Sequence, residues 1–95
     1  MPAYIIVQID VSDLDAYENY KTQVAPTVEK YGGEYVVRGG TQEVLEGTWP
    51  WPRCVVLKFP NMDAAKAWHG SAEYAGPKAL RHAAATSNAL LVEGV

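Results

Sequence analysis

The stretch RCVVLKF, residues Arg53 to Phe59, decides the fold because it is the most hydrophobic strand-like segment of the chain. Successive side chains of a strand point to opposite faces of a sheet. The segment has one fully apolar face and one mixed face, made respectively by Val55, Leu57 and Phe59 and by Cys54, Val56 and Lys58. Apolar residues on both faces predict a central strand that is covered on both sides.

The segments on either side of this strand alternate between strand and helix patterns. Capping residues mark the helix starts, and glycines mark breaks and ends. The first half is expected to form a strand over 4–11, a helix between the capping segment 12–15 and the glycine pair 32–33, and a strand over 34–38 that bends at 39–40 and resumes over 41–46. The second half is expected to form the strand 53–59, a helix from Asn61, and a strand over 86–93. The helix from Asn61 is expected to break at 70–71 and to continue over 73–84. The order βαββαβ predicts an α+β, ferredoxin-like fold, with a four-stranded antiparallel sheet and both helices on one face.

The outer face of this sheet also determines the expected assembly. The first strand places Tyr4 and Ile6 opposite a wholly aliphatic set, so it too is apolar on both sides. A sheet face exposed to water should be polar at alternate positions. We therefore expect a second copy of the chain to cover the outer face and form a homodimer.

Size and composition limit the class of protein. The 95 residues predict one domain over residues 1–95, and 48% hydrophobic with 20% charged residues is an ordinary globular mixture. A net charge of −3 without a basic run argues against binding of nucleic acid. The chain has no apolar run near the roughly 20 residues that a membrane-spanning helix needs, and no signal-peptide pattern. We expect a cytoplasmic protein with no membrane partner, in which the single Cys54 is a buried strand residue.

Blocks along the whole chain together resemble a known family. They are MPAYIIV at 1–7, KYGG at 30–33, VRGG at 37–40, LEGTWP at 45–50, AW at 67–68, SAEY at 71–74 and LVEGV at 91–95. The chain resembles domain-of-unknown-function family 1330, in the dimeric α+β barrel superfamily. The resemblance implies two subunits that pack their sheets face to face, but it implies no particular reaction. Better-known relatives in the superfamily include cofactor-independent monooxygenases, a lactone isomerase and haem-binding enzymes.

The second helix carries the main candidate for chemistry. His69 is the candidate catalytic residue, because histidine titrates near neutrality and can move protons. A pocket under this helix, with Tyr17, Trp68 and Tyr74 as further ligand-binding candidates, would suit it, since the break at 70–71 frees backbone groups. The alternatives are a partly exposed histidine that meets only a carbonyl or water, and a Trp68 that fills the core and leaves no cavity.

Two further candidates come from the middle of the chain. Arg38 precedes a glycine pair and could present its guanidinium to a small carboxylate; the alternative is a salt bridge with Glu34 or Glu43. Trp49 lies in the proline-stiffened segment WPWP and is expected to cover a pocket or reach across the dimer. The alternative for Trp49 is that it plugs the end of the subunit's own core.

No metal or cofactor is expected. His69 and His82 are separated by a helix break and have no acidic partner at ligand spacing. The first strand carries Gln8 and no asparagine, unlike the haem-degrading relatives of the superfamily. Pro2 gives a remote alternative, because removal of Met1 would leave a secondary amine that could act as the base of a tautomerase.

These observations lead to one principal hypothesis and one alternative of another class. The principal hypothesis is a dimeric barrel protein that binds a small, partly apolar organic molecule between helices and sheet, with cofactor-independent oxygenase or isomerase chemistry. The alternative is a non-catalytic ligand-binding or stress-related accessory domain. The two are not separated by any motif in the sequence.

Overall fold

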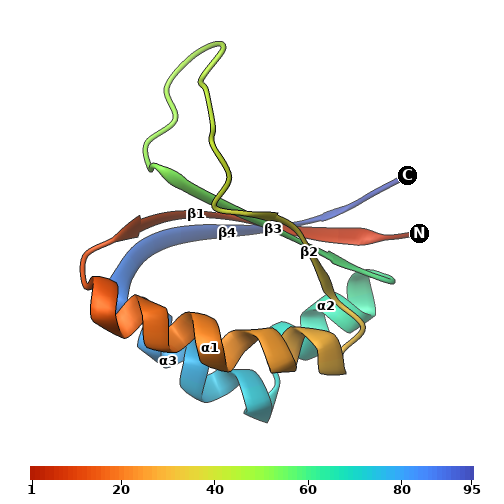
Figure 1. Ribbon diagram of the computed structural model, residues 1–95. Coiled ribbons are helices and arrows are strands. Elements are labelled where there is room, and N and C mark those ends of the chain that lie inside the picture. The colour runs from red at the N-terminus through yellow and green to blue at the C-terminus, as the bar shows by residue number, and fades with distance from the viewer.

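The structure is a computed structural model that describes residues 1–95. It has one four-stranded sheet with three helices on one of its faces, and Figure 1 shows the two layers from the side. In chain order the elements are β1 (Ala3–Val11), α1 (Leu14–Lys30), β2 (Glu34–Arg38), β3 (Arg53–Phe59), α2 (Met62–His69), α3 (Ala72–Ala84) and β4 (Ala85–Glu93). The predicted ferredoxin-like α+β fold is confirmed, with the second helix divided in two.

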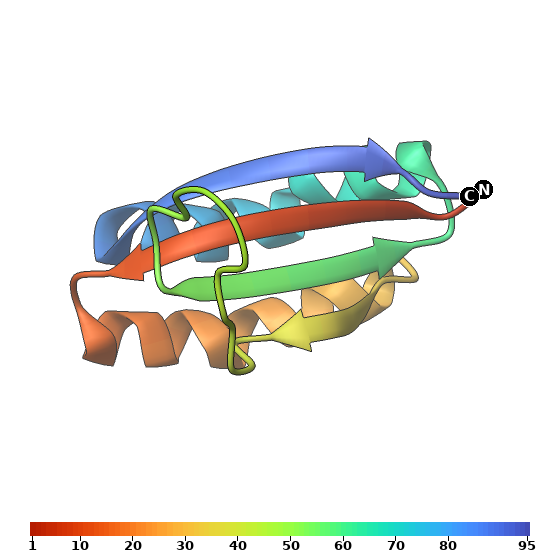
Figure 2. The ribbon, with the colours of Figure 1, turned by 90° about the horizontal axis from the view of Figure 1, so that it is seen from above.

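The sheet is antiparallel, with the strand order β2-β3-β1-β4. β1 and β3 are the central strands, as the two-sided apolar pattern of RCVVLKF predicts (Figure 2). The two chain ends lie side by side at one end of the sheet, where the amide of Gly94 donates to the carbonyl oxygen of Pro2 at 2.7 Å. The first and last strands therefore pair from end to end.

Each helix begins at a side chain that accepts a hydrogen bond from its first turn. Asp13, Asn61 and Ser71 each accept from the backbone amide three residues further on. These bonds satisfy amide groups that have no partner inside the helix. The interruption that the sequence predicts at 70–71 is confirmed, and Ser71 starts a regular third helix there.

The core lies between the helices and the inner face of the sheet. Alternate residues of the central strands point into it, namely Ala3, Ile5, Val7, Ile9, Val55, Leu57 and Phe59. Trp68 of α2 is only 1% exposed and stacks on Tyr74 of α3 with the ring centroids 4.1 Å apart. Its indole N–H donates to the hydroxyl of Thr27 at 3.0 Å. Trp68 therefore joins all three helices.

A β-bulge in β2 changes which side chains face the helices. Tyr35 pairs with Leu57 and Arg38 pairs with Val55, and both partners belong to the buried face of β3. The register shifts between Tyr35 and Val37, so Val36 is an extra residue in the strand. In a regular strand, two residues three positions apart would face opposite sides. The bulge therefore brings both Tyr35 and Arg38 to the helix side.

Residues 39–52 form a long loop, so the prediction that the strand resumes over 41–46 is wrong. Gly39 turns the chain with a φ of 71°, a conformation that favours glycine. Its amide donates to the carbonyl of Cys54, and the β2–β3 register ends beside it at Arg38. The following residues meet no partner strand, and a strand needs one to satisfy its backbone. The loop rises from the side of the sheet opposite the helices (Figure 1).

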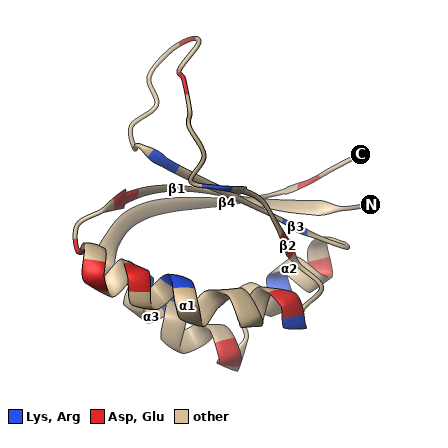
Figure 3. Cartoon of the chain, in the orientation of Figure 1, with Lys and Arg blue, Asp and Glu red and all other residues tan.

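The middle of the outer face of the sheet is apolar, and no helix covers this face. We define it by Tyr4, Ile6, Val37, Cys54, Val56, Leu90 and Val92. On β1 and β3 these residues alternate with buried ones, and on β2 and β4 they pair with an outer-face residue of the neighbouring strand. The side chain of Leu90 is 59% exposed. Figure 3 shows the charged residues on the helices, the loop and the ends of the strands, with the middle of the sheet free of them. None of the three helices has the length and apolar character that crossing a membrane requires.

The carboxylate of Glu73 joins the end of α1 to the start of α3 and should make the stability of the fold depend on pH. The ammonium of Lys30 and the hydroxyl of Tyr31 donate to Glu73 at 2.8 Å and 2.7 Å. These bonds lower the pKa of Glu73 from 4.5 to about 2. The ionised carboxylate therefore stabilises the fold above pH 4.5, and this contribution is lost as the pH falls towards 2.

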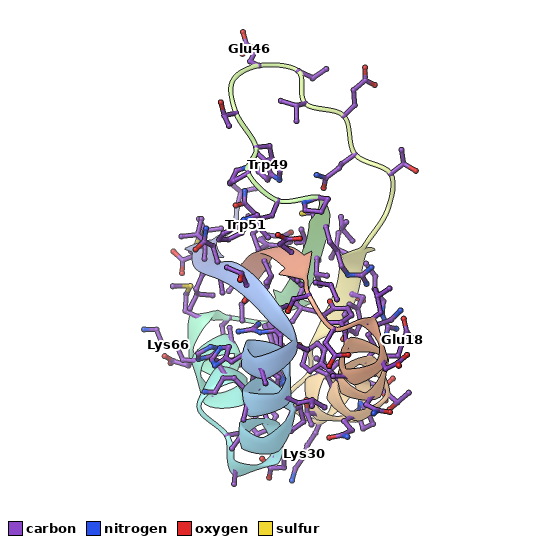
Figure 4. The ribbon with its side chains drawn as sticks, turned by 90° about the vertical axis from the view of Figure 1, so that its left-hand side faces the viewer. Glu18, Lys30, Glu46, Trp49, Trp51 and Lys66 are labelled. Atoms are coloured by element: carbon purple, nitrogen blue, oxygen red, sulfur yellow. The ribbon has the colours of Figure 1, made fainter.

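We expect the melting temperature of the wild type to exceed that of Glu73→Gln at pH 4.5, and the difference to disappear near pH 2. Thermal melts followed by circular dichroism across this range measure it. Glu46→Gln, at the exposed tip of the loop (Figure 4), is the control and should follow the wild type. A gap between wild type and Glu73→Gln that stays constant with pH would contradict the assignment.

Candidate functional site

A cavity lies between α1, α3 and the inner face of the sheet. We call it the central cavity and define it by Tyr17, Tyr35, Arg38, Arg53, Trp68 and Arg81. Its closed end is formed by buried residues, Trp68 and Arg81, whereas Arg38 and Arg53 at its mouth are at least partly exposed. Nine of its 13 lining residues are hydrophobic, and its interior volume is about 20 Å³, enough for a water molecule or a small head group.

All three arginines of the chain line this cavity. The guanidinium of Arg38 lies over the ring of Tyr35, with its central carbon 4.4 Å from the ring centroid. The Nε of Arg53 donates to the hydroxyl of Tyr17 at 3.0 Å, and its guanidinium lies over the Tyr17 ring. None of the three forms an ion pair, so the predicted alternative of a salt bridge for Arg38 is not observed.

Tyrosine hydroxyls supply neutral polar groups on and behind the cavity wall. The hydroxyls of Tyr20 and Tyr74 lie 3.2 Å apart. Burial raises the pKa of Tyr20, and the neighbouring Tyr74 raises it further. Burial is also the main cause that raises the pKa values of Tyr35 and Tyr74. These hydroxyls therefore stay protonated near neutral pH and can donate hydrogen bonds.

The structure brings together three of the sequence candidates and places a fourth behind them. Tyr17, Arg38 and Trp68 line the central cavity. Tyr74 is fully buried and stacks on Trp68, so it supports the wall without forming part of it. The cavity is thus lined by side chains from α1, β2 and α2 together.

His69 lies outside the central cavity. It is exposed on α2 and lines a separate hollow against β4, together with Lys66 and Leu90. Partial burial lowers its pKa, and the positive charges of Lys78 and Arg81 lower it further. A single pocket lined by His69, Trp68 and Tyr17 is therefore not what the structure shows, because adjacent helix residues such as Trp68 and His69 point about 100° apart.

Trp49 belongs to the loop and not to the cavity. Its side chain is 46% exposed, and it borders a hollow of about 460 Å³ with Val37, Leu45 and Cys54. Figure 4 shows Trp49 and Trp51 on the limb of the loop that returns to the sheet, below Glu46 at the tip. Trp49 therefore stands on the same side as the outer face and does not plug the subunit's own core.

Two arginines of the cavity were not singled out from the sequence, although one left a readable signal. Tyr74, Pro77, Arg81 and Ala84 are the buried residues of α3 and recur at helical spacing. An arginine on the buried stripe of a helix is unusual, and this could have identified Arg81. Arg53 gave no such signal, because the first residue of a strand is commonly a solvated charge.

The remaining candidate is at another place in the fold. Pro2 lines a shallow hollow with Met1, Lys58 and Pro60, and no residue of that hollow belongs to the central cavity. No group of three or more histidine, cysteine, aspartate and glutamate side chains comes together anywhere in the structure. The central cavity is lined by arginine, lysine, tyrosine and apolar side chains.

Comparison with solved structures extends the fold assignment. A protein of unknown function from Rhodopseudomonas palustris is 19% identical, with a TM-score of 0.81, covering 99% of this chain and 82% of that one. A dimeric ferredoxin-like protein of unknown function from Jannaschia sp. CCS1 is 11% identical, with a TM-score of 0.76 and 99% and 100% coverage. SnoaB, a cofactor-independent oxygenase from Streptomyces nogalater, is 13% identical, with a TM-score of 0.68 and 99% and 93% coverage.

These identities show a common fold and nothing more specific. No curated protein matches the chain significantly. The family model described as domain of unknown function (DUF1330) matches residues 2–95, almost the entire sequence. The chain therefore belongs to the DUF1330 family, as the sequence blocks predicted.

Proposed function

We propose that the protein is a homodimer in which each subunit binds a small, partly apolar organic molecule in the central cavity. The observation that carries the proposal is the cavity itself, where a mostly apolar wall meets a few converging donors from Tyr17, Arg38 and Arg53. Small-molecule sites usually combine these two features. The solved Jannaschia protein, which shares the fold, is described as dimeric, and this supports the assembly.

Entry of an organic molecule requires the mouth of the cavity to open. The interior is narrow, at about 20 Å³. The mouth, however, is formed by Lys21, Arg38 and Arg53, which are long side chains with many rotamers and are not fully buried. Rotation of these side chains widens the entrance without moving the sheet, so the ligand enters between α1 and β2.

Trp68 provides a direct test of binding. In a Trp49→Phe/Trp51→Phe variant, Trp68 is the only tryptophan and lies on the cavity wall. We expect its emission to change saturably when the protein is titrated with at least one member of a series of small quinones, phenols and lactones. Emission that stays unchanged across the whole series would contradict the proposal.

A cavity-filling variant controls this experiment. Val55 lines the cavity and is 8% exposed, so Val55→Phe should fill it and weaken binding at least tenfold, at a cost of about 1–3 kcal/mol in stability from overpacking. Val36→Phe makes the same change at an exposed position outside the cavity and should bind as the wild type.

Cofactor-independent oxygenase or isomerase chemistry is the second part of the proposal. Both reactions pass through an anionic form of the substrate, and preorganised donors stabilise such charge. The neutral hydroxyl of Tyr35 and the guanidinium groups of Arg38 and Arg53 are donors of this kind. An enzyme of this kind converts its bound ligand to a product, with oxygen uptake for an oxygenase and without it for an isomerase. The alternative, a non-catalytic binding or stress-related accessory domain, releases its ligand unchanged, so analysis of the ligand after incubation separates the two.

A further inference from the structure

The positive charge of the central cavity has no counter-charge in the protein. Its lining includes the three arginines and Lys21, but no aspartate or glutamate. Lys21 pairs with Glu18 at 3.3 Å, whereas the arginines are unpaired. The chain as a whole carries a net charge of −3, so this concentration of cations does not follow from a basic composition. The cavity is therefore a cationic site in an acidic protein.

Arg81 holds the most deeply buried of these charges and is incompletely bonded. Its side chain is 4% exposed, and its Nε has no hydrogen-bond partner. Its Nη2 lies 3.1 Å from Nε2 of His82. A buried guanidinium that has no counter-ion and an unbonded Nε is unfavourable. An anion in the cavity would supply both the missing acceptor and the missing charge.

The walls of the cavity define the shape of that anion. The rings of Tyr17 and Tyr35 lie near the mouth, each beneath an arginine. Trp68 closes the far end near Arg81, where the narrow interior admits a small head group. A molecule that fits has a flat conjugated body at the mouth and its acidic group at the closed end.

We propose, building on the binding function above, that the ligand is a flat organic acid bound as its anion. A carboxylate or phenolate oxygen accepts a hydrogen bond from Nε of Arg81, and the conjugated body lies against Tyr17 and Tyr35. Charge-assisted bonds of this kind are among the strongest that a side chain makes. Arg38 and Arg53 attract the anion to the mouth and then lie over its body.

Isothermal titration calorimetry with a matched pair of probes tests the charge. The probes are 1-naphthoate and 1-naphthamide, which have the same flat body and differ in the acidic group. We expect the wild type to bind naphthoate at least tenfold more tightly. Arg81→Met keeps most of the side-chain length without the charge and should lose this preference, whereas Lys66→Met, an exposed cation outside the cavity, should keep it.

A stability measurement separates a ligand-binding arginine from a structural one. Because Arg81 is buried without a counter-ion and its Nε is unbonded, Arg81→Met should equal or exceed the melting temperature of the wild type without ligand. A large fall in melting temperature would assign Arg81 to the scaffold and overturn this inference. Equal binding of both probes would contradict the preference for an anion but would leave the proposed binding function intact. Binding of neither probe would contradict both the anion preference and the binding function.

Discussion

Replacement of Val56 by glutamate should convert the proposed homodimer to a monomer. Val56 lies at the centre of the outer face, opposite Ile6 on β1 and Val37 on β2. In a two-fold dimer both copies carry the new charge into an apolar interface. Removing a carboxylate from water without a partner costs several kcal/mol. The dimer should therefore dissociate at least about a hundredfold more readily, since about 1.4 kcal/mol corresponds to tenfold.

Sedimentation or light scattering at micromolar concentration measures the effect against the 10.4 kDa mass of one chain. Ala79→Glu places the same charge on the exposed side of α3 and should leave the wild-type dimer intact. A wild type that sediments as a 10.4 kDa monomer would refute the homodimer. A Val56→Glu variant that remains dimeric would instead show that the dimer interface does not lie on the outer face.

Replacement of Trp68 by alanine should remove about 3–5 kcal/mol of stability, a large share of what a domain of this size has. The side chain is 1% exposed and packs on Tyr74 and Phe59, with ring centroids 4.1 and 5.5 Å away. Alanine leaves a cavity among these rings and removes the hydrogen bond to Thr27. The loss should also widen the closed end of the central cavity.

Urea unfolding followed by far-ultraviolet circular dichroism measures this loss independently of tryptophan emission. Trp49→Ala is the matched control, because the same atoms are removed from an exposed loop, and it should change the free energy of unfolding by less than about 1 kcal/mol. If the two variants unfold at similar urea concentrations, Trp68 is not the packing centre that the structure indicates.

Local patterns in the sequence predicted most of the fold. The alternation in RCVVLKF and in the first strand located the two central strands, and the capping segment 12–15 and the cap at Asn61 located two helix starts. The prediction of a strand over 41–46 was wrong because alternation describes a segment alone, whereas a strand exists only beside a partner. The bulge at Val36 left no mark, since an extra residue is recognised only against the neighbouring register.

The candidate site was harder to predict from the sequence because it depends on which residues the tertiary fold brings together. Arg38, Arg53 and Arg81 lie on β2, β3 and α3, and only the folded chain brings them to one cavity. Trp68 was expected either to line a pocket or to fill the core, and the structure buries it on the wall of the cavity. The sequence could not show that its neighbour His69 lies outside the cavity while the more distant Arg81 lies inside it.

The pairing of the first strand with the last also governs how the chain can fold during synthesis. β1 lies between β3 and β4, and the hydroxyl of Ser12 donates to the carbonyl of Ala84, 72 residues away. Contacts between such distant segments raise the contact order and slow folding. On the ribosome, β1 has no partner on its β4 side until the C-terminal segment emerges. The nascent chain therefore exposes an apolar strand edge for most of its translation, a state prone to aggregation.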